Sequence, residues 1–229
     1  MLIVLSLLLI LGAGAVFAHD PSIEEEDWGS FDAPYAVADA TISYALYGYL
    51  DENDIDVFQL EFNKAGADLR VQLITPVCGE HYVSFYPDYI VVGPKADPQY
   101  TDLDLPFELP KDTGVVYASL PSRAQHPTDE QRTTFVEQFG GTEYYDGDQL
   151  DLSIPVAGIY DVVVFADQTG DYTLATGYKE EFNSPLAHML TAVSQIRSGE
   201  WLHRNCTLPP SDPNSILEHH HDHEADSAG

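Results

Sequence analysis

The alternation of apolar and polar residues along short segments is the feature that most restricts how this chain can fold. In the segment DVFQLEF (56–62), Phe58, Leu60 and Phe62 share one face of an extended strand, and the residues between them share the other. Similar runs, rich in β-branched and aromatic residues and separated by turn-forming clusters, occupy residues 41–50, 67–77, 81–92, 114–120, 158–167 and 171–180. With no long helix between them, these runs predict an all-β fold, an antiparallel β-sandwich of the jelly-roll-like type.

The predicted sandwich domain covers residues 35–181, follows an extended acidic lead-in at 19–34, and contains a long proline-rich insert near 94–143. Residues 183–204 change period and predict one amphipathic helix. Its apolar residues recur at spacings of three or four: Leu186, Met189, Leu190, Val193 and Ile196. We expect this face to pack on the sandwich; the alternative, a helix lying on a membrane, lacks the basic polar face that such helices carry.

Residues 1–18 read as a secretory signal peptide, with an apolar run from Leu2 to Leu11 followed by small residues. Cleavage after Ala18 would make His19 the first residue of the mature chain, and cleavage after Ala15 is the alternative. No later stretch approaches the length of a membrane span, which takes about 20 apolar residues. We therefore expect a secreted or periplasmic protein with no transmembrane segment after signal removal.

The charge and the cysteines restrict partners and compartment. The chain has 38 acidic residues against 9 Lys and Arg, a net charge of −29, so there is no basic patch for nucleic acid or anionic membranes. Two cysteines, Cys78 and Cys206, are predicted to form a disulfide in an oxidising compartment. The alternative is a thiolate metal ligand at Cys78, with His81 three residues later.

The tail at 205–229 has little to bury, and we expect it to be disordered without a ligand. It carries His219, His220, His221, Asp222 and His223 in five consecutive positions. Imidazoles on a flexible segment can wrap around one Cu²⁺ or Zn²⁺ ion, usually with moderate affinity and little selectivity. The sequence therefore favours a non-catalytic binding protein whose ligand is a transition-metal ion held by this histidine cluster.

Other metal sites are weaker alternatives. If His19 is the N-terminal residue, its α-amine and Nδ1 can chelate Cu²⁺ and, with one further imidazole, form a histidine brace. Secreted copper carriers and oxidative polysaccharide-cleaving enzymes have such braces, so a redox enzyme is the remaining alternative. Several aspartates in predicted turns could bind Ca²⁺, although no EF-hand spacing is present: Asp51, Asp54, Asp56, Asp167 and Asp171. The chain lacks G-x-S-x-G, H-E-x-x-H and phosphate-binding glycine motifs, and we predict no enzymatic activity.

Two paired elements carry a family resemblance. An Asp-rich turn leads into a strand at DENDIDVFQLEF; Gly158 and Tyr160 then lie in GIYDVVVF, and Gly170, Tyr172 and Leu174 lie in GDYTLAT. This combination resembles the bacterial pre-peptidase C-terminal-like (PPC-type) β-sandwich domains. The resemblance implies a sandwich fold and a non-catalytic accessory role in a secreted protein.

An extracellular protein or glycan is the alternative ligand to a metal ion. Long loops in compact domains are usually functional or disordered, and the 94–143 insert contains Tyr100, Phe107 and Tyr117. If exposed, these rings would stack on sugars or fill pockets of a partner. The insert therefore predicts a docking module.

Overall fold

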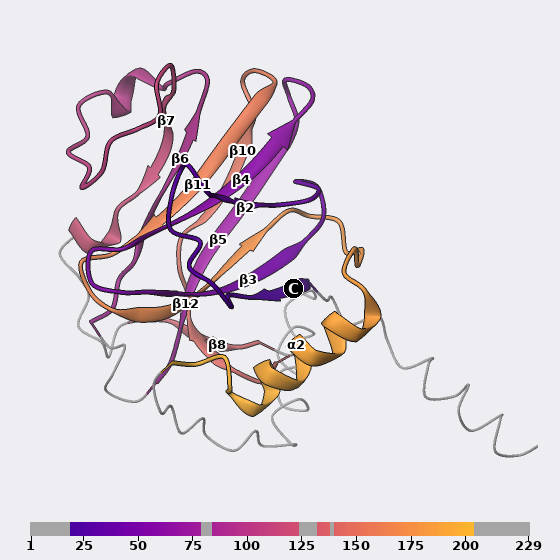
Figure 1. The fold of residues 1–229 in the computed structure, drawn as a ribbon. Helices are drawn as coiled ribbons and strands as arrows, with labels where there is room; N and C mark the ends of the chain where they lie inside the picture. The colour runs from indigo at the N-terminus through magenta and orange to yellow at the C-terminus, as the bar shows by residue number, and fades with distance from the viewer. Residues whose placement is uncertain (1–18, 79–83, 124–131, 138–139, 204–229) are drawn as a thin grey trace, which may run out of the picture.

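The computed structural model describes residues 19–78, 84–123, 132–137 and 140–203 (Figure 1). In this part of the chain, two β-sheets enclose a common core. One sheet has the order β1-β3-β12-β5-β9-β8, with β10 also paired to β5, and the other has the order β2-β4-β11-β6-β7. Most pairings are antiparallel, but β1–β3 and β2–β4 are parallel. The prediction of an all-β sandwich with one helix is confirmed.

The elements have these bounds: β1 Asp20–Ile23, β2 Tyr35–Ala36, β3 Tyr44–Leu50, β4 Ile55–Phe62, β5 Asp68–Pro76, β6 Asp88–Gly93, β7 Gly114–Ser119, β8 Thr134–Val136, β9 Glu143–Tyr145, β10 Gln149–Ser153, β11 Gly158–Phe165, β12 Gly170–Thr176 and α2 Leu186–Ser198. Two short 3₁₀ helices, η1 (Pro98–Tyr100) and η2 (Pro121–Arg123), flank β7.

The main core lies between the two sheets and follows the predicted alternation. Phe58, Leu60 and Phe62 of β4 are buried there, together with Tyr160 of β11 and Tyr172 of β12. The Tyr160 ring packs edge-on against Phe62, with ring centroids 5.7 Å apart. Each sheet therefore contributes every second residue of its central strands to one shared apolar layer.

The outer face of the five-stranded sheet is also buried, and the insert covers it. Val57, Val163 and Phe165 form a second cluster against which apolar residues of the segment from Tyr100 to Leu109 pack. Because β11 is covered on both faces, its central residues form the continuous apolar run VVVF. The first part of the insert, residues 94–113, lies beside β6 and β7, at the upper left of Figure 1.

This packing corrects the prediction of an exposed aromatic docking surface. Tyr100, Phe107 and Tyr117 are all half-buried. The Phe107 ring packs edge-on against Phe165 at 5.2 Å, and the Tyr100 ring packs against Tyr117 at 6.4 Å. Tyr100 and Phe107 cover the outer face of the sheet, because a strand as apolar as β11 would otherwise leave that face in water. Tyr117 packs instead against the core between the sheets.

Helix α2 and Trp201 cover the outer face of the other sheet, where Ile196 and Trp201 pack with Tyr47 and Tyr144. Gly199 ends the helix in the left-handed conformation, with φ of 73°, and the chain then turns back to place Trp201. The prediction that the whole apolar stripe packs on the sandwich is correct only for the C-terminal half. Leu186 and Leu190 are 65% and 59% exposed, respectively.

Several elements differ from the predicted ones. The lead-in forms β1, and the buried Asp20 carboxylate accepts hydrogen bonds from the backbone N–H groups of Asn183 and Ser184, each at 2.8 Å. The strand predicted at 81–92 is shorter: β6 begins after Pro87, whose nitrogen cannot donate to a ladder. Across the described segments, no helix is long and apolar enough to span a membrane.

Candidate functional site

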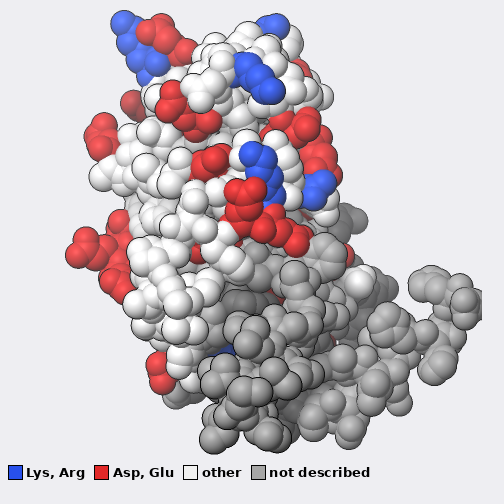
Figure 2. Space-filling model, turned by 90° about the vertical axis from the view of Figure 1, so that its right-hand side faces the viewer, with Lys and Arg blue, Asp and Glu red and all other residues white. Residues whose placement is uncertain are grey.

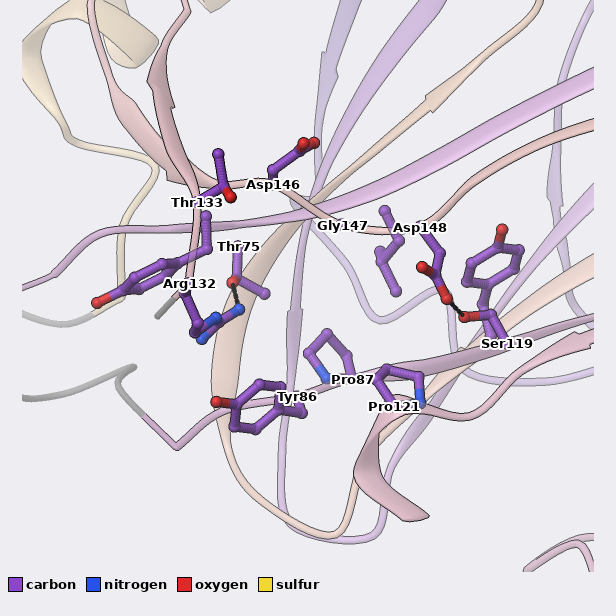
Figure 3. Close-up of a pocket in the computed structure, with 13 residues that line it drawn as sticks. Thr75, Tyr86, Pro87, Ser119, Pro121, Arg132, Thr133, Asp146, Gly147 and Asp148 are labelled. Atoms are coloured by element: carbon purple, nitrogen blue, oxygen red, sulfur yellow. Dashed lines mark hydrogen bonds between the residues drawn. The ribbon is translucent and has the colours of Figure 1, made fainter. Parts of the chain in front are cut away.

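A cavity of about 340 Å³ opens where the two sheets meet (Figure 3). Strand β5 of one sheet and strands β6 and β7 of the other contribute to its wall, and residues 132–133 and 145–148 close it. We call it the Arg132 cavity; it is lined by Leu73, Thr75, Tyr86, Pro87, Tyr89, Ser119, Pro121, Arg132, Thr133, Tyr145, Asp146, Gly147 and Asp148.

Arg132 forms one end of this cavity and is held in place on several sides. Its guanidinium carbon lies 4.4 Å from the centre of the Tyr86 ring and 3.8 Å from that of Tyr145. Nη2 donates a hydrogen bond to Thr75 Oγ1 at 3.0 Å, and Nη1 donates to the Phe85 carbonyl oxygen at 3.5 Å. Arginine suits this position because its planar cation can stack on aromatic rings while its edge donates hydrogen bonds.

The opposite end of the cavity is acidic. Asp148 lies there and accepts a hydrogen bond from Ser119 Oγ at 2.5 Å, whereas the exposed Asp146, near Thr133 in Figure 3, accepts one from Gln72 Nε2 at 3.1 Å. Pro87 and Pro121 lie between the Arg132 end and the Asp148 end in Figure 3. The cavity is therefore polarised, with a cation at one end, a carboxylate at the other and apolar rings between them.

No local sequence pattern pointed to this cavity, since its residues come from segments up to 75 positions apart, between Leu73 and Asp148. The sequence feature that could have drawn attention to Arg132 is the scarcity of basic residues, since the whole chain has 9 Lys and Arg. In such a chain, each arginine that is enclosed by aromatic residues stands out.

The predicted tail site lies outside the described residues. This applies to His219, His220, His221, Asp222 and His223, so metal binding by them stays a prediction. Cys206 also lies outside the described part. Cys78 is buried and is not a free thiol, and its pairing with Cys206 remains a prediction.

His19 lines a smaller cavity of about 90 Å³ beside Phe135, Glu137 and Tyr144. Its Nδ1 lies 2.5 Å from Ser43 Oγ. Desolvation lowers the pKa of its imidazole, against the opposing effect of Glu137. The described residues that line this cavity include no second histidine, and a copper brace at His19 stays a prediction.

Three carboxylates form an acidic cluster between the loop after β1 and the start of β4. Glu24, Asp27 and Asp56 each offer a carboxylate oxygen, and these oxygens lie within 4.8 Å of one another. Glu24 accepts hydrogen bonds from the backbone N–H groups of Tyr49 and Trp28, at 2.7 and 3.2 Å. Burial is the main cause that raises the pKa of Glu24 to about 7 and that of Asp56 to about 8.

The structure places the aspartates predicted as possible Ca²⁺ ligands in different surroundings. Asp56 joins the acidic cluster, and Asp51 and Asp54 line the cavity beside it. Asp171 is instead engaged by His203, whose Nδ1 lies 2.8 Å from its carboxylate, and Asp167 lines a different cavity. The sequence reasoning missed Glu24 and Asp27, because nothing local indicates that β1 places the lead-in next to β4.

Comparisons with known proteins give distant structural likenesses. Neither a scan of family models nor a search of curated proteins finds a match, so the PPC-type resemblance stays a prediction. The similar solved structures include PliG, a periplasmic inhibitor of g-type lysozyme, from Aeromonas hydrophila and from Salmonella Typhimurium. The first is 15% identical with a TM-score of 0.33, over 63% of this chain and 95% of that chain. The second is 14% identical with a TM-score of 0.30, over 63% and 97%.

Proposed function

We propose that this protein is a non-catalytic extracytoplasmic protein that docks a basic protein partner, and that the Arg132 cavity receives a segment of that partner. The observation that carries the proposal is the fixed polarity of the cavity. Arg132 is stacked between two rings and Asp148 is bonded to Ser119, so both charges keep their positions. Groups held in this way suit recognition, because little side-chain freedom is lost when a ligand binds.

A peptide segment matches this cavity better than a sugar does. Its carbonyl groups can face the Arg132 end and its N–H groups or a basic side chain can face Asp148, while its aliphatic parts contact Pro87 and Pro121. Tyr86 and Tyr145 each turn one ring face to the guanidinium, which closes that face to a stacked sugar. The stacking surface typical of a glycan site is thus already occupied.

The charge of the protein supports a basic partner. The net charge is −29, and Asp146 and Asp148 are exposed at the cavity. Acidic side chains are spread over the face shown in Figure 2, and the few basic ones lie mostly in its upper half. A field of one sign raises the association rate of an oppositely charged partner and makes it depend on ionic strength.

The experiment is selection of random peptides displayed on phage against the immobilised full-length protein, followed by Kd measurements. We expect the selected peptides to carry Lys or Arg and to bind at least about 10-fold more weakly to Asp148→Lys, since a contact between charged groups would become repulsive. Asp151→Lys makes the same charge change outside the cavity lining and should leave the Kd within about 2-fold. Equal weakening by both variants, or selection of neutral peptides, would contradict the proposal.

Binding of Cu²⁺ or Zn²⁺ by the tail is a second candidate function, favoured by four imidazoles within five residues, His219 to His223. Calorimetric titration of the full chain and of a variant with all four histidines replaced by alanine tests it. We expect the tightest transition-metal binding event to disappear in the variant. Unchanged binding would remove the tail from consideration.

A further inference from the structure

Three carboxylates from two separate segments converge beside the lead-in, and their spacing is that of a metal site. Glu24 and Asp27 come from the loop after β1, and Asp56 comes from β4. Two oxygens bound to one Ca²⁺ at about 2.3–2.6 Å can be at most about 4.6–5.2 Å apart. The cluster oxygens lie within 4.8 Å of one another, which is close to the spacing that three ligands of one Ca²⁺ ion need.

Asp56 supplies an independent observation. Its side chain is fully buried, and its Oδ2 accepts a hydrogen bond from the Tyr172 hydroxyl at 2.5 Å. Its other oxygen, Oδ1, is buried and accepts no hydrogen bond from any of the described residues. A buried carboxylate oxygen without a partner is costly, because desolvation of the oxygen is not compensated. The charged neighbours that act on Asp56 are Glu24, Asp54 and Asp27, all of them acidic.

The loop that carries Glu24 and Asp27 is built to hold them near Asp56. The Glu24 N–H donates to the Tyr47 carbonyl at 2.9 Å, which extends the β1–β3 pairing, and the Trp28 carbonyl accepts from the Val57 N–H at 3.0 Å. The Asp27 carboxylate folds back over Gly29, where any Cβ would collide with it. Both ends of the loop are therefore tied to strands of the sandwich.

We propose that Glu24, Asp27 and Asp56 bind one Ca²⁺ ion. The donors are all carboxylate oxygens, which suits a hard cation and not Cu²⁺ or Zn²⁺. A cavity of about 200 Å³ adjoins the cluster and leaves room for water ligands, which complete the coordination shell of Ca²⁺. It is lined by Glu24, Glu25, Glu26, Asp27, Tyr49, Asp51, Asp54 and His203, and Nδ1 of His203 is engaged by Asp171 at 2.8 Å. The ion would link the loop after β1 to β4 and would coordinate Asp56 Oδ1, the buried oxygen described above.

Terbium luminescence and thermal unfolding of the full chain test the site, after treatment with a chelator and in a background of Mg²⁺. Trp28 follows Asp27 directly and can sensitise Tb³⁺, a probe of Ca²⁺ sites. We expect one saturable site from which Ca²⁺ displaces Tb³⁺, and a rise in Tm with Ca²⁺. Asp56→Asn keeps the shape of the side chain and should weaken Ca²⁺ binding at least about 10-fold, because a ligand charge is lost.

Two further variants keep the test decisive. Asp27→Asn alters an exposed residue and should also weaken Ca²⁺ binding, so the test remains valid if Asp56→Asn does not fold. Asp151→Asn removes one exposed carboxylate outside the cluster and should leave the affinity unchanged. The proposal is overturned if Asp27→Asn and Asp151→Asn bind Ca²⁺ equally, if no saturable Ca²⁺ binding occurs, or if Zn²⁺ takes the site in preference to Ca²⁺.

Discussion

Truncation of Ile196 to alanine tests whether α2 is an integral part of the core. Ile196 is fully buried in the cluster with Tyr144 and Trp201, whereas Leu190 on the same helix is 59% exposed. The substitution Ile196→Ala should therefore destabilise the protein far more than Leu190→Ala. Both positions are interior to the helix, and the helix propensities of Ile and Leu each differ from that of Ala by less than about 0.7 kcal/mol, so a larger difference between the two variants reports packing.

The expected magnitude follows from the carbon atoms removed and from the surroundings. Ile196→Ala deletes three buried carbons, each worth about 0.8 kcal/mol of transfer free energy. The rigid rings of Tyr144 and Trp201 limit collapse around the site, so a residual cavity adds to the cost. We expect a loss of about 3–4 kcal/mol in the free energy of unfolding for Ile196→Ala and about 1 kcal/mol or less for Leu190→Ala.

Urea unfolding followed by circular dichroism measures both losses, and acrylamide quenching of tryptophan fluorescence shows whether the helix is still docked. One of the two tryptophans, Trp201, lies in the α2 cluster, and the other, Trp28, lies in the core between the sheets. If Ile196→Ala costs no more than Leu190→Ala, the α2 cluster contributes nothing to global stability and the reasoning is refuted.

Three further substitutions probe buried polar groups and backbone geometry. Asp161→Asn should raise Tm at pH 7, because burial raises the pKa of Asp161 above its ordinary value of 3.8 and its charged form therefore destabilises the folded state. Below about pH 4 the carboxyl is neutral in the folded and the unfolded state, so the increase in Tm should vanish there. An equal gain at both pH values would contradict this. Tyr172→Phe deletes the hydrogen bond that the Tyr172 hydroxyl donates to the buried Asp56 carboxylate, and should cost about 1–3 kcal/mol in urea unfolding; a loss under about 0.5 kcal/mol would contradict it. Gly177→Ala should lower Tm much more than Gly66→Ala does. Both glycines have positive φ, which costs alanine about 1 kcal/mol, but only at position 177 would a Cβ also collide with a backbone carbonyl oxygen. Equal shifts in Tm would argue against that collision.

The long strands could be predicted from the sequence because their burial is encoded locally. In β4, Phe58 and Leu60 face the core between the sheets, and the alternation alone identifies that face. In β11, Val162 and Val163 point to different clusters on opposite faces, and the run of valines reflects this double burial. Where packing is regular, a period of two or a continuous apolar run is thus sufficient to predict a strand and the faces that it buries.

The short strands and the sites could not be predicted in this way. Strands β1, β2, β8 and β9 have two to four residues each, and such segments form because a neighbouring edge supplies hydrogen bonds. Their register depends on the whole fold, as do the positions of Arg132 and Glu24. Asp56 was recognised as a candidate calcium ligand, but its partners depend on the parallel pairing of β1 with β3.

The positions of β11 and β12 have a consequence for the order of folding. β11 lies between β4 and β6, and β12 lies between β3 and β5, so both sheets are completed by strands near the end of the domain. Strands β4 and β6 cannot find their central neighbour until residue 165 has been synthesised, and β3 and β5 cannot find theirs until residue 176. Contacts between residues so far apart in the sequence form slowly, and unpaired strand edges invite association between chains. The nascent polypeptide should therefore remain open until both closing strands are available, and depend on protection from aggregation during that interval.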